Sequence, residues 1–188
     1  MQFRPLEIPG LWLVELEKVE DERGFFSRLF CGDTFLERGL CANYPQWSVS
    51  FNHRRGTLRG LHFQAPPHEE VKLVSCTRGA VFDVAVDVRP GSPTRAQWAG
   101  VELTADNRSA LYIPAGFAHG FQTLTDDAEV LYHISERYRP EAGGGVRWDD
   151  PELAIAWPKT EQRVMSSRDQ ALPTLRDMRL RDKRPRDV

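Results

Sequence analysis

Short runs in which apolar and polar residues alternate dominate the middle of the chain. The clearest is VFDVAVDV, residues 81–88, because alternation places its Phe and Val side chains at even positions on one face of a strand. Asp83, Ala85 and Asp87 then share the other face, so one face is expected in a core while the other holds charge. Similar runs predict further strands at 11–19, 47–51, 71–77, 98–104, 110–114, 120–125 and 129–135.

Turn and helix signals are fewer. The Arg78-Gly79 pair between two strand runs predicts a tight hairpin turn. The stretch DTFLERG predicts a short helix with Asp33 as its N-cap and Gly39 as its C-terminal stop, and a second helix is expected around 168–180. Many strands with a few short flanking helices favour an all-β fold, a closed or two-sheet antiparallel barrel of the jelly-roll type.

Length and charge limit the class of protein. The 188 residues suit one domain over 1–188, with a core expected at about 10–160. The 25 Lys and Arg residues against 27 Asp and Glu residues give a formal net charge of −2, so neither nucleic acid nor a membrane is expected as a partner. The end of the chain, about 172–188, alternates Arg and Asp and is expected to be a solvated tail rather than a nucleic-acid arm.

The N-terminus and the cysteines bear on the compartment. The first residues lack a basic stretch followed by an apolar core, and no run approaches the roughly 20 apolar residues of a membrane span. Three cysteines without CxxC spacing suggest neither a disulfide framework nor a zinc site. A soluble cytoplasmic protein with reduced thiols is therefore expected.

Two histidine motifs resemble those of the cupin superfamily, whose jelly rolls often bind a metal. GTLRGLH contains His62 at the spacing of the first motif, and PAGFAH ends in His119 as the second motif does. However, Gln64 replaces the second histidine of the first motif, and the ammonium of Lys72 would oppose a divalent ion. No metal is therefore expected, although a metal-dependent cupin and purely structural histidines stay open as alternatives.

Cationic groups cluster around the first motif. Arg59, His62 and Lys72 fall within what the pattern suggests is one hairpin, and Arg23 precedes them in DERGFF. Such groups are costly to bury without an anion, and a phosphorylated ligand would supply one. Arg offers forked donors and Lys a point charge to phosphate oxygens. The pattern therefore indicates an anionic, phosphorylated ligand.

Six motifs in this order and spacing resemble the dTDP-4-dehydrorhamnose 3,5-epimerase family of sugar-nucleotide enzymes. They are DERGFF, GTLRGLHFQAPP, VFDVAVDVRPGSP, YIPAGFAHGF, VLYHISERYRPE and VRWDDPELAIAWP, and the likeness spans about 10–169. The resemblance implies a cupin that uses no metal or other cofactor and acts on a nucleotide diphosphate 4-keto-6-deoxysugar. The 4-ketone acidifies the C–H bonds at C3 and C5, so a base can remove a proton and an acid can return one from the opposite face.

The resemblance also implies roles for individual residues. His62 matches the base, Asp169 the carboxylate that orients it, and Tyr132 the acid on the other face, while Lys72 would stabilise the enolate oxygen. The matching substrate-binding positions are Arg23, Phe26, Arg28, Gln46, Ser48, Arg59, His119 and Tyr138, the last as the aromatic that stacks on the base.

Three of the implied binding positions depart from the family pattern. Arg28 stands where the family usually has Glu, Ser48 replaces the Asn of a Gln-x-Asn motif, and Gly143 replaces another Glu. All three concern binding rather than proton transfer. The resemblance implies dTDP-4-dehydro-6-deoxy-D-glucose as the substrate, converted to dTDP-4-dehydro-L-rhamnose, and the three departures leave a GDP- or CDP-linked ketosugar open.

Alternation within single strands supports part of this site. His62 and Gln64 share one face of their strand, and Tyr132 can point inward from another. Arg59 would face away from His62 unless the strand is irregular at Gly60, so a bulge is predicted there.

The resemblance is compatible with other reactions and also implies an oligomeric assembly. Epimerisation at C3 alone, a 3,4-ketoisomerase and a non-catalytic sugar-nucleotide binding protein are alternatives on the same scaffold. The resemblance implies a homodimer with exchanged N-terminal strands, in which Arg23 and Phe26 would serve the other subunit's site. At family level the expected pathway is dTDP-rhamnose biosynthesis, which supplies a deoxysugar for a surface polysaccharide or a glycosylated metabolite.

Overall fold

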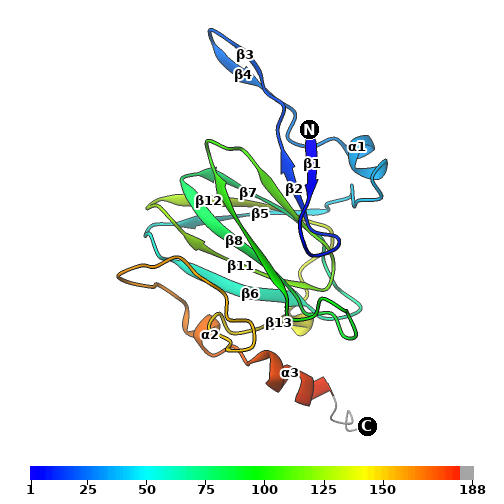
Figure 1. The fold of residues 1–188 in the computed structure, drawn as a ribbon, viewed down its shortest axis with the longest axis vertical. Coiled ribbons are helices and arrows are strands. Elements are labelled where there is room, and N and C mark those ends of the chain that lie inside the picture. The colour runs from blue at the N-terminus through cyan, green and yellow to red at the C-terminus, as the bar shows by residue number, and fades with distance from the viewer. Residues whose placement is uncertain (183–188) are drawn as a thin grey trace.

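The computed structural model describes residues 1–182, and within them the strands form two antiparallel sheets packed face to face (Figure 1). The six-stranded sheet has the order β1 (Gln2–Pro5), β2 (Trp12–Glu15), β10 (Ala110–Ile113), β7 (Lys72–Arg78), β12 (Ala128–Ile134), β5 (Gln46–Asn52). The five-stranded sheet has the order β13 (Gly143–Gly145), β6 (Leu58–Gln64), β11 (Phe117–Thr123), β8 (Ala80–Asp87), β9 (Trp98–Thr104). The all-β jelly-roll prediction is confirmed.

The core has three clusters: two lie on the two sides of the five-stranded sheet, and a third, which includes Val14, Phe35, Leu73 and Tyr112, lies on the outer side of the six-stranded sheet. The first lies between the sheets and includes Val74, Val81, Leu111 and Phe121. The second lies on the outer side of the five-stranded sheet, where residues after β13 cover it; it includes Leu61, Val84, Val86, Leu153 and Leu175. Both faces of β8 are therefore buried, and its aspartates, expected on a charged face, have no exposed surface.

The chain changes sheets at Gly79, where a hairpin was predicted. That prediction is wrong, because β7 pairs with β10 and β12 while β8 pairs with β9 and β11. Gly79 has φ +71°, and a Cβ there would collide with Thr125 Oγ1 and crowd Ala128. The grouping of Arg59, His62 and Lys72 in one hairpin is wrong for a related reason, since β6 and β7 also belong to different sheets.

The bulge predicted at Gly60 is confirmed. His62 lies opposite His119 and Arg59 opposite Phe121, so β6 uses one residue more than β11 over this interval. Gly60 has φ +119°, and a Cβ there would lie 2.6 Å from Gly120 Cα. Because of the extra residue, Arg59 and His62 line the same cavity.

The helices differ in detail from the predictions. Helix α1 (Gly32–Leu36) has Cys31 as its N-cap, and the predicted cap Asp33 lies in its first turn. The single helix expected around 168–180 is two helices, α2 (Ser167–Gln170) and α3 (Leu175–Asp182), because Pro173 between them cannot continue a helix. Of the helices in residues 1–182, none has the length and apolar character of a membrane span.

The C-terminal part is more tightly packed than its charge pattern suggests. Leu175 is fully buried, so packing continues past the expected core limit of 160 and into the expected tail of 172–188. Residues 183–188 of that tail lie outside the described residues. The single-domain prediction for 1–188 stays a prediction.

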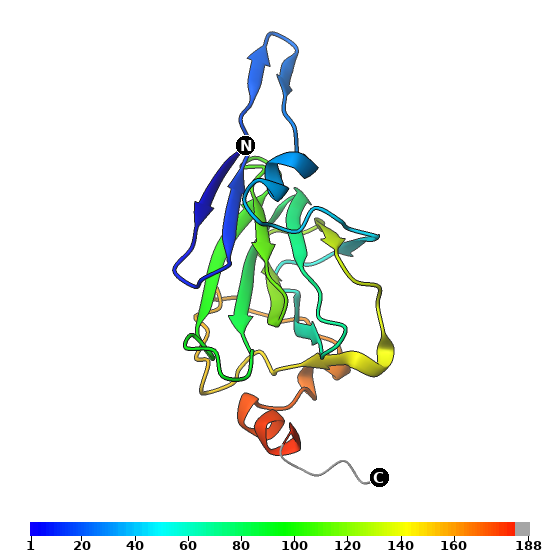
Figure 2. The same cartoon turned by 90° about the vertical axis from the view of Figure 1, so that its right-hand side faces the viewer.

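A two-stranded hairpin stands apart from both sheets. Strands β3 (Val19–Asp21) and β4 (Gly24–Phe26) pair only with each other, and the hairpin projects from one end of the barrel, opposite the end near α3 (Figures 1 and 2). The sequence pattern predicted one run over 11–19, and the structure divides it between β2 and the start of β3. Every side chain of the hairpin is exposed.

Candidate active site

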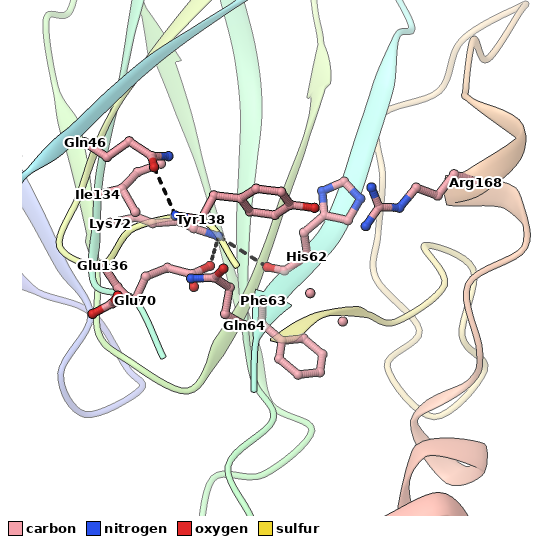
Figure 3. A pocket seen from close by; sticks show the side chains of 12 residues that line it. Gln46, His62, Phe63, Gln64, Glu70, Lys72, Ile134, Glu136, Tyr138 and Arg168 are labelled. Carbon is pink, nitrogen blue, oxygen red and sulfur yellow. Dashed lines mark hydrogen bonds and ion pairs between the residues drawn. The ribbon is translucent and has the colours of Figure 1, made fainter. Parts of the chain in front are cut away.

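A cleft opens between the two sheets as two adjoining cavities. The inner cavity, of about 420 Å³, is lined by all four predicted catalytic residues: His62, Lys72, Tyr132 and Asp169. The outer cavity, of about 290 Å³, is lined by Gln46, Gln64, Glu70, Glu136, Tyr138 and Gly143 among others (Figure 3). His62, Lys72, Ile134 and Arg168 line both, so the cavities form one cleft.

His62 and Asp169 form a hydrogen-bonded pair. His62 Nε2 lies 2.7 Å from Asp169 Oδ1, and Asp169 Oδ2 accepts a bond from the Gly60 N–H at 3.3 Å. Asp169 lies in the first turn of α2, which Ser166 caps by accepting a bond from the Asp169 N–H. Burial alone would raise the pKa of Asp169, but His62, Gly60 and Ser166 together hold this pKa below its usual value. The carboxylate is therefore ionised at neutral pH and fixes the imidazole.

Tyr132 lies on the wall opposite His62, because β12 belongs to the six-stranded sheet and β6 to the five-stranded one. Burial, reinforced by the charge of Asp83, raises the pKa of the Tyr132 phenol, and Arg59 and Ser50 oppose this rise only in part. The phenol is thus protonated at neutral pH. A proton acceptor and a proton donor face one cavity from two sides.

Lys72 is on the same wall as Tyr132. Its Nζ lies 2.9 Å from Glu70 Oε1 and donates to the backbone carbonyl oxygen of His62 at 3.4 Å (Figure 3). The ammonium therefore bridges the two sheets at the point where the inner and outer cavities meet.

Two guanidinium groups of the cleft have no carboxylate partner among the described residues. Arg59 Nε donates to the neutral Asn52 Oδ1 at 2.8 Å, and Arg168 lines both cavities without a recorded ion pair. By contrast, His119 Nε2 lies 2.9 and 3.0 Å from the two oxygens of the buried Asp83. Arg59 and Arg168 are therefore the cations available to a bound anion.

Residues 5–177 match the sequence profile of the dTDP-4-dehydrorhamnose 3,5-epimerase family. The chain belongs to this family.

Individual relatives agree with this membership. A dTDP-4-dehydrorhamnose 3,5-epimerase of Sinorhizobium fredii is 44% identical over 175 residues, which cover 93% of this chain and 90% of the relative. The 3,5-epimerase RmlC of Legionella pneumophila, solved with dTDP-4-keto-L-rhamnose, has a TM-score of 0.88 and 40% identity over 93% of each chain. ChmJ of Streptomyces bikiniensis, a 3'-monoepimerase solved with dTDP-quinovose, has a TM-score of 0.87 and 40% identity, covering 94% of this chain and 89% of that one.

Five of the binding residues that family membership suggested lie in the cleft. Ser48, Arg59 and His119 line the inner cavity, and Gln46 and Tyr138 line the outer one. Gln46 Oε1 accepts a bond from the Tyr138 N–H at 3.0 Å, which holds the aromatic residue at the cavity wall.

Gly143, where this family usually has Glu, also lines the outer cavity. A Cβ at this position would lie 3.3 Å from the backbone oxygen of Pro140 and 3.7 Å from both Arg168 Nη2 and the Tyr138 hydroxyl. Glycine therefore allows a close approach to Pro140 beside the guanidinium and the aromatic residue.

Three predicted binding residues lie outside the cleft of their own chain. Arg23 pairs with Asp21 on the projecting hairpin, and Phe26 is 75% exposed there. Arg28 follows the hairpin, with Nη1 3.7 Å from Cys31 Sγ. None of them lines either cavity.

Gln64 occupies the place of the second histidine of the cupin metal motif. Its Nε2 donates to the carbonyl oxygens of His68 and Arg137 at 3.0 and 3.3 Å, and its Oε1 accepts from the Arg139 N–H at 2.6 Å. The amide thus clamps the segment that carries Tyr138. Among the described residues, no group of three or more His, Cys, Asp or Glu side chains is placed to hold a metal ion.

Sequence reasoning missed three charged residues of the site. Arg168 is adjacent to Asp169 in SSRDQ, so the same motif could have indicated it. Asp83 was assigned only to a charged strand face, and its partner His119 comes from another strand, which no local pattern identifies. Glu70 lies two residues before its partner Lys72, so two-residue alternation could have indicated that pair.

Proposed function

We propose that this chain is an epimerase that inverts one or two carbons beside the ketone of a nucleotide diphosphate 4-keto-6-deoxysugar. The observation that carries the proposal is the placement of the His62–Asp169 pair and of Tyr132 on opposite walls of one cavity. Inversion requires a proton to leave one face of the sugar ring and another to arrive on the opposite face, and the two walls supply an acceptor and a donor for this.

The proposed reaction gives each proton a route through a residue of the cleft. His62 Nε2 is engaged by Asp169, so Nδ1 carries the free lone pair and removes the proton on carbon. The C–H electrons move to the ketone oxygen to form an enolate, which the Lys72 ammonium stabilises. The ketone then re-forms, and the enolate carbon takes a proton from the Tyr132 hydroxyl on the other face of the ring. Exchange with water then returns a proton to Tyr132 and removes one from His62.

Charge and aromatic placement support the substrate class. Arg59 and Arg168 are available for a diphosphate, and the half-exposed ring of Tyr138 offers a stacking surface for a base in the outer cavity. The similar proteins named above act on or bind dTDP sugars, so dTDP-4-dehydro-6-deoxy-D-glucose is the favoured substrate and dTDP-4-dehydro-L-rhamnose its product. A GDP- or CDP-linked ketosugar stays an alternative substrate, because Arg28, Ser48 and Gly143 differ from the residues usual in the family.

A second candidate is epimerisation at C3 alone. The similarity to the 3'-monoepimerase ChmJ favours it, because the same scaffold supports that outcome. A 3,4-ketoisomerase and a metal-dependent cupin remain less favoured alternatives.

Proton exchange in D2O, followed by NMR, tests the proposal. Wild-type protein is incubated with 4-keto-6-deoxyglucose linked to dTDP, UDP, GDP or CDP. We expect deuterium at C3 and C5 with the dTDP sugar and a retained ketone at C4; label at C3 alone identifies the monoepimerase. Movement of the ketone to C3 would identify a ketoisomerase, and binding without label from any sugar would contradict an epimerase.

We further propose a cytoplasmic homodimer in dTDP-rhamnose supply, in which each β3–β4 hairpin completes the partner's cleft. The exposed apolar side chains on the outer face of the edge strand β5 and on the hairpin support this assembly; they include Val19, Phe26, Trp47 and Val49. The test mixes His62→Asn with Arg23→Ala protein, each of low activity alone. Recovery of activity on subunit exchange is expected, because one hybrid cleft then contains both native residues. If the hairpin serves its own chain, mixing restores nothing.

A further inference from the structure

Glu70 is the least well satisfied acidic group of the cleft. It is buried, with Oε1 2.9 Å from Lys72 Nζ, while Oε2 is the only buried side-chain nitrogen or oxygen in the described residues that lacks a hydrogen-bond partner. A buried carboxylate with one satisfied oxygen is costly to the folded state. Two other buried carboxylates differ, because Asp169 in the cleft and Asp83 behind His119 use both oxygens.

The single bond that Glu70 makes restricts Lys72. An ammonium has three N–H donors, and here one faces Glu70 Oε1 and a second faces the His62 carbonyl oxygen. One donor remains, and Lys72 borders both cavities, so this donor is left for a ligand in the cleft. Without the bond to Glu70, the flexible lysine side chain could turn toward the phosphates held by Arg59 and Arg168.

We infer that Glu70 is a positioning residue, which holds the Lys72 ammonium against β6 so that its remaining N–H faces the ketone oxygen rather than the diphosphate. This inference rests on the proposed function, since it assumes that Lys72 stabilises an enolate. The positioning of Lys72 depends on the hydrogen-bond acceptor of Glu70, whereas the negative charge of Glu70 compensates the buried ammonium and so contributes to stability.

Two substitutions separate the acceptor from the charge. Glu70→Gln keeps an oxygen for Lys72, so kcat stays near the wild-type value, while the melting temperature falls because the buried ammonium loses its carboxylate partner. Glu70→Leu keeps the volume without an acceptor, so kcat falls about tenfold or more through misplacement of Lys72. The affinity for dTDP, the probe used for binding, does not weaken in either variant. Glu69→Gln is the matched control, because this neighbouring carboxylate lines neither cavity of the cleft.

A double-mutant cycle with Lys72→Gln shows whether Glu70 acts through Lys72. In that background Glu70→Leu changes the deuterium exchange rate by less than about twofold, because the group it positions is gone. The inference is overturned if Glu70→Leu retains wild-type kcat, if Glu70→Gln loses as much activity as Glu70→Leu, or if the loss persists without Lys72. A failure of the proposed function looks different, since wild-type protein itself then exchanges no protons.

Discussion

Strands β5 and β8 both alternate along their length, yet the structure uses the two faces of each strand differently. On β8 both faces are buried, one between the sheets and the other beneath the segment after β13. On β5 the large apolar side chains of Trp47, Val49 and Phe51 face outward, with 64%, 61% and 37% of their surface exposed. Ser48 and Ser50 face the cleft.

The difference between these strands distinguishes the sheet that holds catalytic side chains in place from the face that is free to contact a partner. The five-stranded sheet is covered on both sides, so it holds His62, Arg59 and His119 on a rigid wall. The six-stranded sheet contributes Tyr132 and Lys72, and its edge strand β5 presents an apolar outer face that residues 1–182 leave uncovered. A substitution on one strand should therefore affect stability, and the equivalent substitution on the other should affect assembly or binding.

The largest expected effect concerns the rigid wall. Replacing His62 by Asn removes the base, so the deuterium exchange rate falls by about 10²- to 10⁴-fold, the usual contribution of general acid–base catalysis. The free energy of unfolding also falls, by about 1 kcal/mol or more, because the buried Asp169 carboxylate loses its bond to His62. His53→Asn serves as the control, since His53 is exposed and lines neither cavity. Near-normal exchange in the His62 variant would refute the base assignment.

The next effect concerns the inward face of β8. Asp83→Ala leaves His119 buried without its partner, so the free energy of unfolding falls by about 3 kcal/mol, as when one member of a buried pair is removed. Ser50→Ala, on the inward face of β5, should cost less than about 1 kcal/mol, because it removes one partly buried hydroxyl. Urea denaturation at pH 7 measures both. Equal losses of unfolding free energy in the two variants would mean that the walls formed by β8 and β5 are equally rigid.

The outward faces provide a matched pair of valines. Val84→Ala opens space in the layer beneath β8 and lowers the free energy of unfolding by about 2 kcal/mol. Val49→Ala on β5 stays within about 0.5 kcal/mol of wild type but raises the dissociation constant of the proposed dimer. Light scattering across a dilution series follows the dimer, with Leu36→Ala, an exposed position on α1, as the control. An unchanged dimer in the Val49 variant would move the interface away from β5.

The smallest effect is a pH dependence from Asp169, the residue of α2 that is paired with His62 of the rigid wall. The folded-state pKa of Asp169 lies below its usual value, so its contribution to stability is complete above the unfolded-state pKa of about 4. This contribution is lost as the pH falls through the lower, folded-state pKa. The difference in unfolding free energy between wild type and Asp169→Asn should therefore be largest at pH 6 and shrink toward pH 3. A difference that is constant over this range would show that the carboxylate charge contributes nothing.

The sequence by itself determined most of the strands, though not β1, β4 or β13, and much of the chemistry. Alternation with a period of two decides which residues share a face, so Gln64 could be placed with His62, and the need for a bulge at Gly60 followed from Arg59. The six motifs, which include those around His62 and Tyr132, indicated the family, and the profile match confirms it. These properties depend on residues close together in the chain.

Only the tertiary structure decided which faces meet. Glycine at position 79 suits both a hairpin turn and a change of sheet. The chain changes sheets there because β7 and β8 pair with different, distant strands. Distant pairing also brings Asp83 to His119 and exposes the apolar face of β5. The physical reason is that burial and ion pairing depend on contacts between segments far apart in sequence, and a local pattern does not identify the partner segment.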